Sequence, residues 1–232
     1  MKMQISNEFY TLEKKYIMKK IWILMGASLV IASLISSCRK DPIDNLSEEE
    51  TRIYVTNYDK DVDFGTYSTF SIVDSVAVVT NNGDYSKELT NYDQQLINTV
   101  KQSFIDRGYK LVDKTASPDL AVNLTRIDNT YSSVVIGGPG YWSGWPGYWD
   151  PGYWGYPGWG YYFPPYYGVF NYKERSVAID LVDLKNAAKE GDNQLTTIWN
   201  AMLRGQGVWN SNNIESMVKA VFDQSTYLET TL

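Results

Sequence analysis

The chain contains no histidine and only one cysteine among its 232 residues. Histidine is the commonest transition-metal ligand and the commonest general base, so its absence argues against zinc hydrolases and against Ser-His-Asp catalysis. A single cysteine forms no disulfide within one chain, and a hydrophobic core must therefore hold the fold together. We expect no metal site and no cofactor.

Positive charge is also scarce. The chain has 21 basic and 27 acidic residues, and without residues 1–37 the balance becomes 16 against 25, a formal charge of −9. No stretch of the sequence forms a basic stripe that would offset this negative charge locally. A polyanion would be repelled by such a surface, so we exclude nucleic acid as a partner.

One long apolar run lies near the N-terminus. Lys19 and Lys20 precede an uncharged run from Ile21 to Ile35, which is typical of a secretory signal peptide. The run is shorter than the roughly 20 apolar residues of a membrane-spanning helix. We assign residues 1–37 to a signal peptide, and because Met18 begins a cleaner signal, we interpret residues 1–17 as an over-extended start.

Small residues at the end of this run lead into Cys38, and the motif Ile35-Ser36-Ser37-Cys38 resembles the lipobox of bacterial lipoproteins. The resemblance implies that Cys38 becomes the mature N-terminus and carries acyl chains such as palmitate; the alternative is a free thiol in a secreted protein. Arg39 stands where an aspartate would favour inner-membrane retention. We expect a lipid anchor in the outer membrane, on the periplasmic face or the cell surface.

The rest of the chain predicts a short tether and one domain. Residues 38–51 are polar and fit a tether, and residues 52–232 suit a single domain. Alternating or β-branched residues predict strands, whereas residues 74–88 have the composition of a loop. Within one predicted strand, Leu120, Val122 and Leu124 face one way and alternate with more polar positions. The strands are predicted at 52–58, 66–73, 109–112, 120–127, 176–184 and 195–203.

Two helices are predicted. In the first, Thr90 and Asp93 fit a capping box, an apolar stripe runs from Tyr92 to Phe104, and Gly108 ends the helix. The second begins near Asn212, with Glu215 at the reciprocal capping position. The fold class is therefore α+β: an antiparallel sheet with two helices packed on one face and a long insertion rich in Gly, Tyr, Trp and Pro.

Several short motifs occur in a fixed order along the chain. They are Asp63-Phe64-Gly65-Thr66-Tyr67-Ser68-Thr69-Phe70, Arg107-Gly108-Tyr109, Pro118-Asp119-Leu120, the stretch from Ala178 to Asp183, and Ile198-Trp199. In this order they resemble the bacterial lipoprotein family known as domain of unknown function 4136. The match covers roughly residues 52–225 and is interrupted by the insertion. Members combine a signal or lipobox with a small α+β domain, and the family's activity is unknown, so the resemblance implies no catalytic residues.

The insertion, residues 137–168, carries five of the eight tryptophans on a segment interrupted by glycine and proline. Disordered linkers are poor in aromatics, so a simple linker is a weak explanation. Three explanations stay open: the rings pack on the domain's own sheet or on another copy, they bind an envelope glycan or protein, or they sit at the membrane interface. Candidate contact residues are Trp142, Trp145, Trp149, Trp154, Trp159, Tyr148 and Tyr153.

The carboxylates give little support for an enzyme. Asp180 and Asp183 are three residues apart on a predicted strand, so they point to opposite faces, and Asp119 fits a turn cap. Asp59, Asp61 and Asp63 alternate but lack the rest of a calcium loop. We expect a non-catalytic binding or structural component of the cell envelope; the alternative is a carboxylate-dependent hydrolase acting on envelope glycans.

Overall fold

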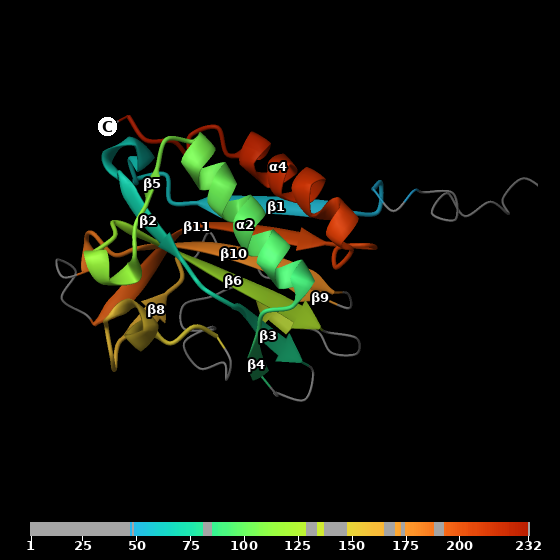
Figure 1. Cartoon of the computed structure of the whole chain (residues 1–232), viewed down its shortest axis with the longest axis horizontal. Helices are drawn as coiled ribbons and strands as arrows, with labels where there is room; N and C mark the ends of the chain where they lie inside the picture. Colours follow the sequence, from blue (N-terminus) through green and yellow to red (C-terminus); the bar gives the residue numbers. More distant parts are fainter. Residues whose placement is uncertain are drawn as a thin grey trace, which may run out of the picture. The chain divides into compact units, whose positions relative to one another are not determined.

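Figure 1 shows a computed structural model of the chain. It describes residues 47, 49–80, 85–128, 134–136, 148–164, 170–172, 175–187 and 193–231, which belong to one compact unit, Ser47–Leu232. The predicted signal peptide, Cys38 and most of the predicted tether lie outside the described residues, as do Trp142 and Trp145. Within the described part, no helix is long and apolar enough to cross a membrane.

The described strands form one large sheet and one small one. The large sheet runs in the order β1-β11-β10-β6-β2-β5, with β3 beside β6, β4 beside β3, and β8 beside β11. The small sheet pairs β7 (Val134–Ile136) with β9 (Phe170–Tyr172). The large sheet contains β1 (Ile53–Tyr58), β2 (Thr69–Ile72), β3 (Val76–Thr80), β4 (Tyr85–Glu88), β5 (Lys110–Leu111), β6 (Leu120–Asp128), β8 (Gly160–Tyr162), β10 (Ser176–Asp183) and β11 (Gln194–Arg204).

The large sheet is mixed, which corrects the expectation of an antiparallel one. Its centre is antiparallel, because β10 pairs that way with both β6 and β11 and β1 pairs that way with β11. However, β2 and β3 both run parallel to β6, β2 runs parallel to β5, and β8 runs parallel to β11. Two neighbouring parallel strands can be joined only by a crossover connection. Between β3 and β6 this connection includes the helix that lies between β4 and β5.

Two helices lie side by side across one face of this sheet (Figure 1). They are α2 (Asn91–Asp106) and α4 (Ile214–Gln224), so this part of the predicted architecture is confirmed. The capping box of α2 forms as predicted between Thr90 and Asp93, and Gly108 after the helix adopts a left-handed φ of 89°. Only glycine adopts that conformation at little cost, which explains the chain reversal there.

The start of α4 differs from the prediction. Asn213 caps the helix without a side-chain hydrogen bond, so Glu215 does not form a reciprocal capping pair. Instead, Asn210 caps a preceding 3-10 turn, η6 (Ser211–Asn213), by accepting a hydrogen bond from the Asn212 amide. The turn runs directly into α4. The other short turns are η2 (Phe64–Thr66), η3 (Lys114–Ala116) and η5 (Pro151–Trp154).

The loop prediction for residues 74–88 is wrong. These residues form the antiparallel pair β3 and β4, with Val79 opposite Tyr85. The sequence does carry a strong hairpin signal there, since Asn82-Gly83 lies between two strand-forming runs. The pair matters for the site, because β4 places Lys87 beside Trp149 of the aromatic segment (residues 148–163 of the insertion) and places Glu88 on the same arginine, Arg126, that Asp93 of the following helix contacts.

Each face of the central strands has its own cover. On the helix face, Trp199 of β11 packs edge-on against Phe104 of α2, with ring centroids 6.4 Å apart, and contacts Phe222 of α4 at 5.8 Å. The opposite face carries polar side chains and is covered by residues 148–163 of the insertion. As a result all nine residues of β6 except Asp128 are buried.

Candidate functional site

The insertion face of the sheet is built around three buried polar side chains on neighbouring strands. Asn123 of β6 and Asn200 of β11 both lie opposite Asp180 of β10. The Asn200 amide donates to Asp180 Oδ1 at 2.6 Å. Asp180 and Asn123 are fully buried, so each polar atom there needs a partner from whatever covers the face.

Aromatic side chains of the insertion supply those partners. The Tyr148 hydroxyl donates to Asp180 Oδ2 at 3.1 Å, and the Trp154 indole donates to Asn123 Oδ1 at 3.0 Å. The Asn123 amide in turn donates to the hydroxyls of Tyr148 and Tyr161. Tyrosine and tryptophan suit this position because each buries a large apolar ring and still offers one polar atom.

Protonated tyrosines are required for this arrangement. Burial raises the pKa of the Tyr148 hydroxyl well above its ordinary value of 10.0, and the Asp180 carboxylate raises it further. Burial likewise raises the pKa of Tyr161. Both phenols therefore stay neutral, and the Tyr148 hydroxyl remains a donor toward Asp180. The network holds the segment to the sheet and is closed to solvent.

The structure divides the seven predicted contact residues into three groups. Tyr148, Trp149 and Trp154 are buried against the domain, and the Trp149 indole donates to the Leu124 carbonyl at 3.0 Å. Tyr153 and Trp159 are half-buried and packed at the edge of the core. Trp142 and Trp145 lie outside the described residues.

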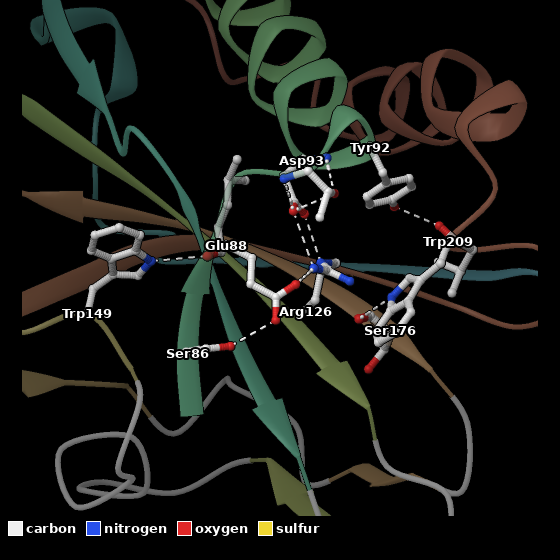
Figure 2. A network of polar contacts seen from close by, with 11 residues as sticks. Ser86, Glu88, Tyr92, Asp93, Arg126, Trp149, Ser176 and Trp209 are labelled. Atoms are coloured by element: carbon white, nitrogen blue, oxygen red, sulfur yellow. Dashed lines mark hydrogen bonds and ion pairs between the residues drawn. The ribbon is translucent and has the colours of Figure 1, made fainter. Parts of the chain in front are cut away.

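A second polar centre lies on the helix face, where Arg126 of β6 is held between two carboxylates. Figure 2 shows the guanidinium between Glu88 of β4 and Asp93 of α2, at 2.6 Å and 2.8 Å. Asp93 is fully buried and also accepts hydrogen bonds from the backbone amide and hydroxyl of Thr90. One carboxylate therefore caps α2 and fixes Arg126 at the same time.

Trp209 lies beside this ion pair. The guanidinium carbons of Arg126 and Arg175 are 4.8 Å and 4.7 Å from the centre of its ring, and its indole donates to the Ser176 carbonyl at 3.3 Å. A hollow of about 470 Å³ adjoins the ring and the 205–210 loop. Arg175 also pairs with Asp128 at 3.4 Å. Because both cations already lie on the ring, the arrangement fixes Trp209 in place.

Sequence analysis missed Arg126, although a signal was present. Arg126 continues the period of two that placed Leu120, Val122 and Leu124 on one face. A charged residue on a predicted apolar face indicates a buried ion pair. The partners were not predictable, because Glu88 lies in the stretch interpreted as a loop and Asp93 was assigned only a capping role.

The carboxylates weighed as catalytic groups have separate surroundings. Asp180 belongs to the insertion network, whereas Asp183 accepts hydrogen bonds from Tyr67 and Asn186. Asp119 accepts from the amides of Ser68 and Thr69, so its side chain joins the start of β6 to the start of β2 and does not cap the local turn that the sequence had suggested. Among the described residues, no group of three or more His, Cys, Asp or Glu side chains is placed to hold a metal ion.

A mixed sheet covered by two helices on one face and by an aromatic segment on the other defines the class of domain. A family model described as "Domain of unknown function (DUF4136)" matches residues 54–225. The chain belongs to this family.

Two solved structures are similar to this chain, and the first of them belongs to the same family. A crystal structure of a DUF4136 family protein from Bacteroides thetaiotaomicron is similar at 29% sequence identity and a TM-score of 0.65, covering 77% of this chain and 98% of that one. A dodecameric PelC variant from Paraburkholderia phytofirmans matches at 10% identity and a TM-score of 0.37, covering 78% and 99% of the two chains. A comparison with curated proteins gives no match.

Proposed function

We propose that this protein is a lipid-anchored component of the outer membrane, attached through Cys38, which binds an envelope glycan through its aromatic segment without catalysing a reaction. The N-terminal lipobox motif supports the anchor. Family membership adds no activity, because the family's own description names none. The proposal therefore depends on the geometry of the aromatic segment.

One observation carries the binding role: the described part of the segment directs some of its rings inward and leaves a second set of rings half-exposed. Trp149 and Trp154 are 1% and 5% exposed and fix the segment to the sheet. Tyr156 and Trp159, with ring centroids 4.9 Å apart, remain half-buried, as does Tyr153. Rings held on a rigid base offer flat apolar faces and polar edges, which suits a sugar ring.

The hydrolase alternative gains no support from Asp180 and Asp183, the two carboxylates that share a strand. Asp180 and Asp183 are 0% and 5% exposed, and each is occupied by its own internal hydrogen bonds. A glycosidase needs two carboxyl groups that flank the scissile bond. We therefore propose binding without turnover.

The anchor is tested by expressing the full chain with an alkyne analogue of palmitate and separating the membranes on a density gradient. We expect label in the wild type, no label in Cys38→Ala, and outer-membrane fractionation of the wild type alone. Label in the Cys38→Ala chain, or a soluble wild type, would contradict the anchor.

The binding role is tested by co-sedimentation of the full chain in detergent with purified peptidoglycan sacculi. We expect Trp159→Ser combined with Tyr156→Ser to reduce the bound fraction at least fivefold while circular dichroism stays unchanged. Tyr54→Ser, a half-buried tyrosine of β1, is the matched control. Sedimentation that is absent in the wild type, or equal in all three proteins, would overturn the binding role.

A further inference from the structure

A groove of about 590 Å³ runs along the edge of the sheet, between α2, the end of β2 and the turn after β5. Its volume lies within the range of small-ligand sites. Tyr153 of the aromatic segment closes one side, and its hydroxyl accepts a hydrogen bond from the Asp74 amide at 3.3 Å. The segment thus forms a wall of the groove as well as a cover for the sheet.

Lysines gather at this wall. Lys114 Nζ lies 3.6 Å from the centre of the Tyr153 ring, and Lys87 Nζ lies 5.5 Å from the same ring and 4.2 Å from that of Trp149. Lys101 of α2 lines the groove with Lys114, and Lys110 lies on the adjoining β5.

Within the described part of the chain these lysines form no direct ion pair. The ion pairs formed there involve Arg126, Arg175 and Lys219, and none involves Lys87, Lys101, Lys110 or Lys114. The closest polar partner of Lys101 is neutral, the Asn98 side-chain oxygen at 3.2 Å. The insertion itself has no lysine or arginine, so the tertiary fold supplies the positive charge beside its rings.

The groove also presents hydrogen-bonding groups suited to hydroxyls. Asp74 and Asp113 line it, and the hydrogen bonds from Ser75 and Thr115 engage only the Oδ1 atom of each carboxylate. Ser71 lines it as well and is only 5% exposed. A serine hydroxyl both donates and accepts hydrogen bonds, so its presence in the lining suits a polar ligand.

These features together select one class of ligand. A simple anion would meet two carboxylates as well as two lysines, and a neutral sugar would leave the lysines unpaired. A sugar that carries a carboxylate satisfies both sets, because its hydroxyls donate to Asp74 and Asp113 while its acid group accepts from Lys101 and Lys114. The face of the exposed Leu111 side chain, 40% accessible, offers an apolar contact for the sugar ring.

We propose that this groove binds an acidic saccharide, held by Lys101 and Lys114 through its carboxylate and by Asp74, Asp113 and Ser71 through its hydroxyls. The proposal rests on the proposed function, in which the partner is an envelope glycan, and it names the chemical class and the site. No covalent step is involved.

Isothermal titration of the full chain in detergent with trigalacturonate tests the proposal, with maltotriose as the neutral probe and citrate as the carboxylate without a sugar. We expect trigalacturonate to bind at least tenfold more tightly than either. Combining Lys101→Gln with Lys114→Gln should weaken it at least tenfold, and raising the salt concentration should weaken it in the wild type. Lys219→Gln, which changes an exposed lysine paired with Asp223 on α4, should have no effect.

The lysine substitutions are at partly exposed positions and are expected to leave the fold intact, which thermal unfolding checks. Equal binding of citrate and trigalacturonate, or binding that the double substitution leaves unchanged, would overturn the proposal. Trigalacturonate binding without sedimentation on sacculi would refute the proposed function in its peptidoglycan form and keep the groove. Sedimentation that depends on Trp159, without trigalacturonate binding, would refute the groove alone.

Discussion

The two faces of the central sheet are buried equally well but by different chemistry. The helix face is covered by apolar side chains of α2 and α4, and the charge of its buried Arg126 is matched by Asp93 and Glu88. The insertion face carries Asn123, Asp180 and Asn200 under tyrosine and tryptophan rings. A segment rich in glycine and proline can thus cover a sheet when its rings bring their own hydrogen-bond donors.

The difference in chemistry predicts a difference in response to mutation. Loss of an apolar side chain on the helix face costs hydrophobic burial and leaves a cavity. Loss of a polar side chain on the insertion face leaves donors without acceptors, which costs free energy through desolvation. The predictions below test this contrast from the largest expected effect to the smallest.

Phe104→Ala is expected to cause a large loss on the helix face. Phe104 is fully buried, and the centre of its ring lies within 6 Å of the ring centres of Phe70, Tyr109 and Phe222. The free energy of unfolding in urea should fall by about 3–5 kcal/mol. Gln102→Ala, at an exposed position of the same helix, should change it by less than about 0.5 kcal/mol. A Phe104→Ala loss below about 1 kcal/mol would show that this face is loosely packed.

Arg126→Met should also be costly, because it leaves the fully buried Asp93 carboxylate without its cation. Removing one partner of a buried pair costs about 3–5 kcal/mol. Combining Arg126→Met with Asp93→Asn should recover part of the loss in the same urea experiment. An additive double mutant would mean that the two side chains do not depend on each other.

Asn123→Leu probes the insertion face directly. The substitution removes the acceptor of the Trp154 indole and the donor to Tyr148 and Tyr161, and it puts an apolar side chain of similar size in their place. We expect a loss of about 1–3 kcal/mol, since buried polar groups lose their partners. Trp154 emission should become easier to quench with acrylamide if the segment loosens. Unchanged stability would indicate that ring burial alone holds the segment.

Alkaline pH should weaken the same face. Because the pKa of Tyr148 is raised in the folded state, its contribution to stability is complete below the ordinary value of 10.0 and is lost as pH rises above it. In wild type the free energy of unfolding should decline above pH 10, and each such tyrosine contributes a slope of about 1.4 kcal/mol per pH unit. Tyr148→Phe should make the decline shallower by that amount. An identical slope would contradict the assignment.

Tyr153 offers a spectroscopic check at the edge of the segment. Partial burial, together with the nearby Asp74 carboxylate, raises the pKa of Tyr153 to about 12. The absorbance change at high pH that Tyr153→Phe removes should therefore have its midpoint near pH 12. A midpoint near 10 would mean that this ring is fully solvated and does not form the wall of the groove.

The smallest effect is expected at Arg175, the exposed cation over Trp209. Its side chain is 57% exposed and its ion pair with Asp128 is long, at 3.4 Å. Arg175→Gln should change the free energy of unfolding by no more than about 1 kcal/mol, because water screens exposed pairs. A loss as large as that of Arg126→Met would show that the two arginines around Trp209 act as one unit.

Local patterns determined much of the fold in advance. The capping box and apolar stripe of α2, the presence of a second helix near the C-terminus and the alternation along β6 were all predicted, because each depends on residues close together in the chain. The family, too, is recognisable from short motifs in order. The opposite orientations of Asp180 and Asp183 followed from the period of a strand alone.

Only the tertiary structure decided what lies against each face. The period of two showed that Asn123 and Thr125 face away from Leu124, but no local rule could show that Tyr148 and Trp154 would cover them. Parallel pairing of β2 and β3 with β6 depends on a crossover, which strand composition does not reveal. The lysines beside Tyr153 come from β4, from the 3-10 turn η3 and from α2, elements separated along the chain. Their side chains come together only once the sheet and α2 have assembled.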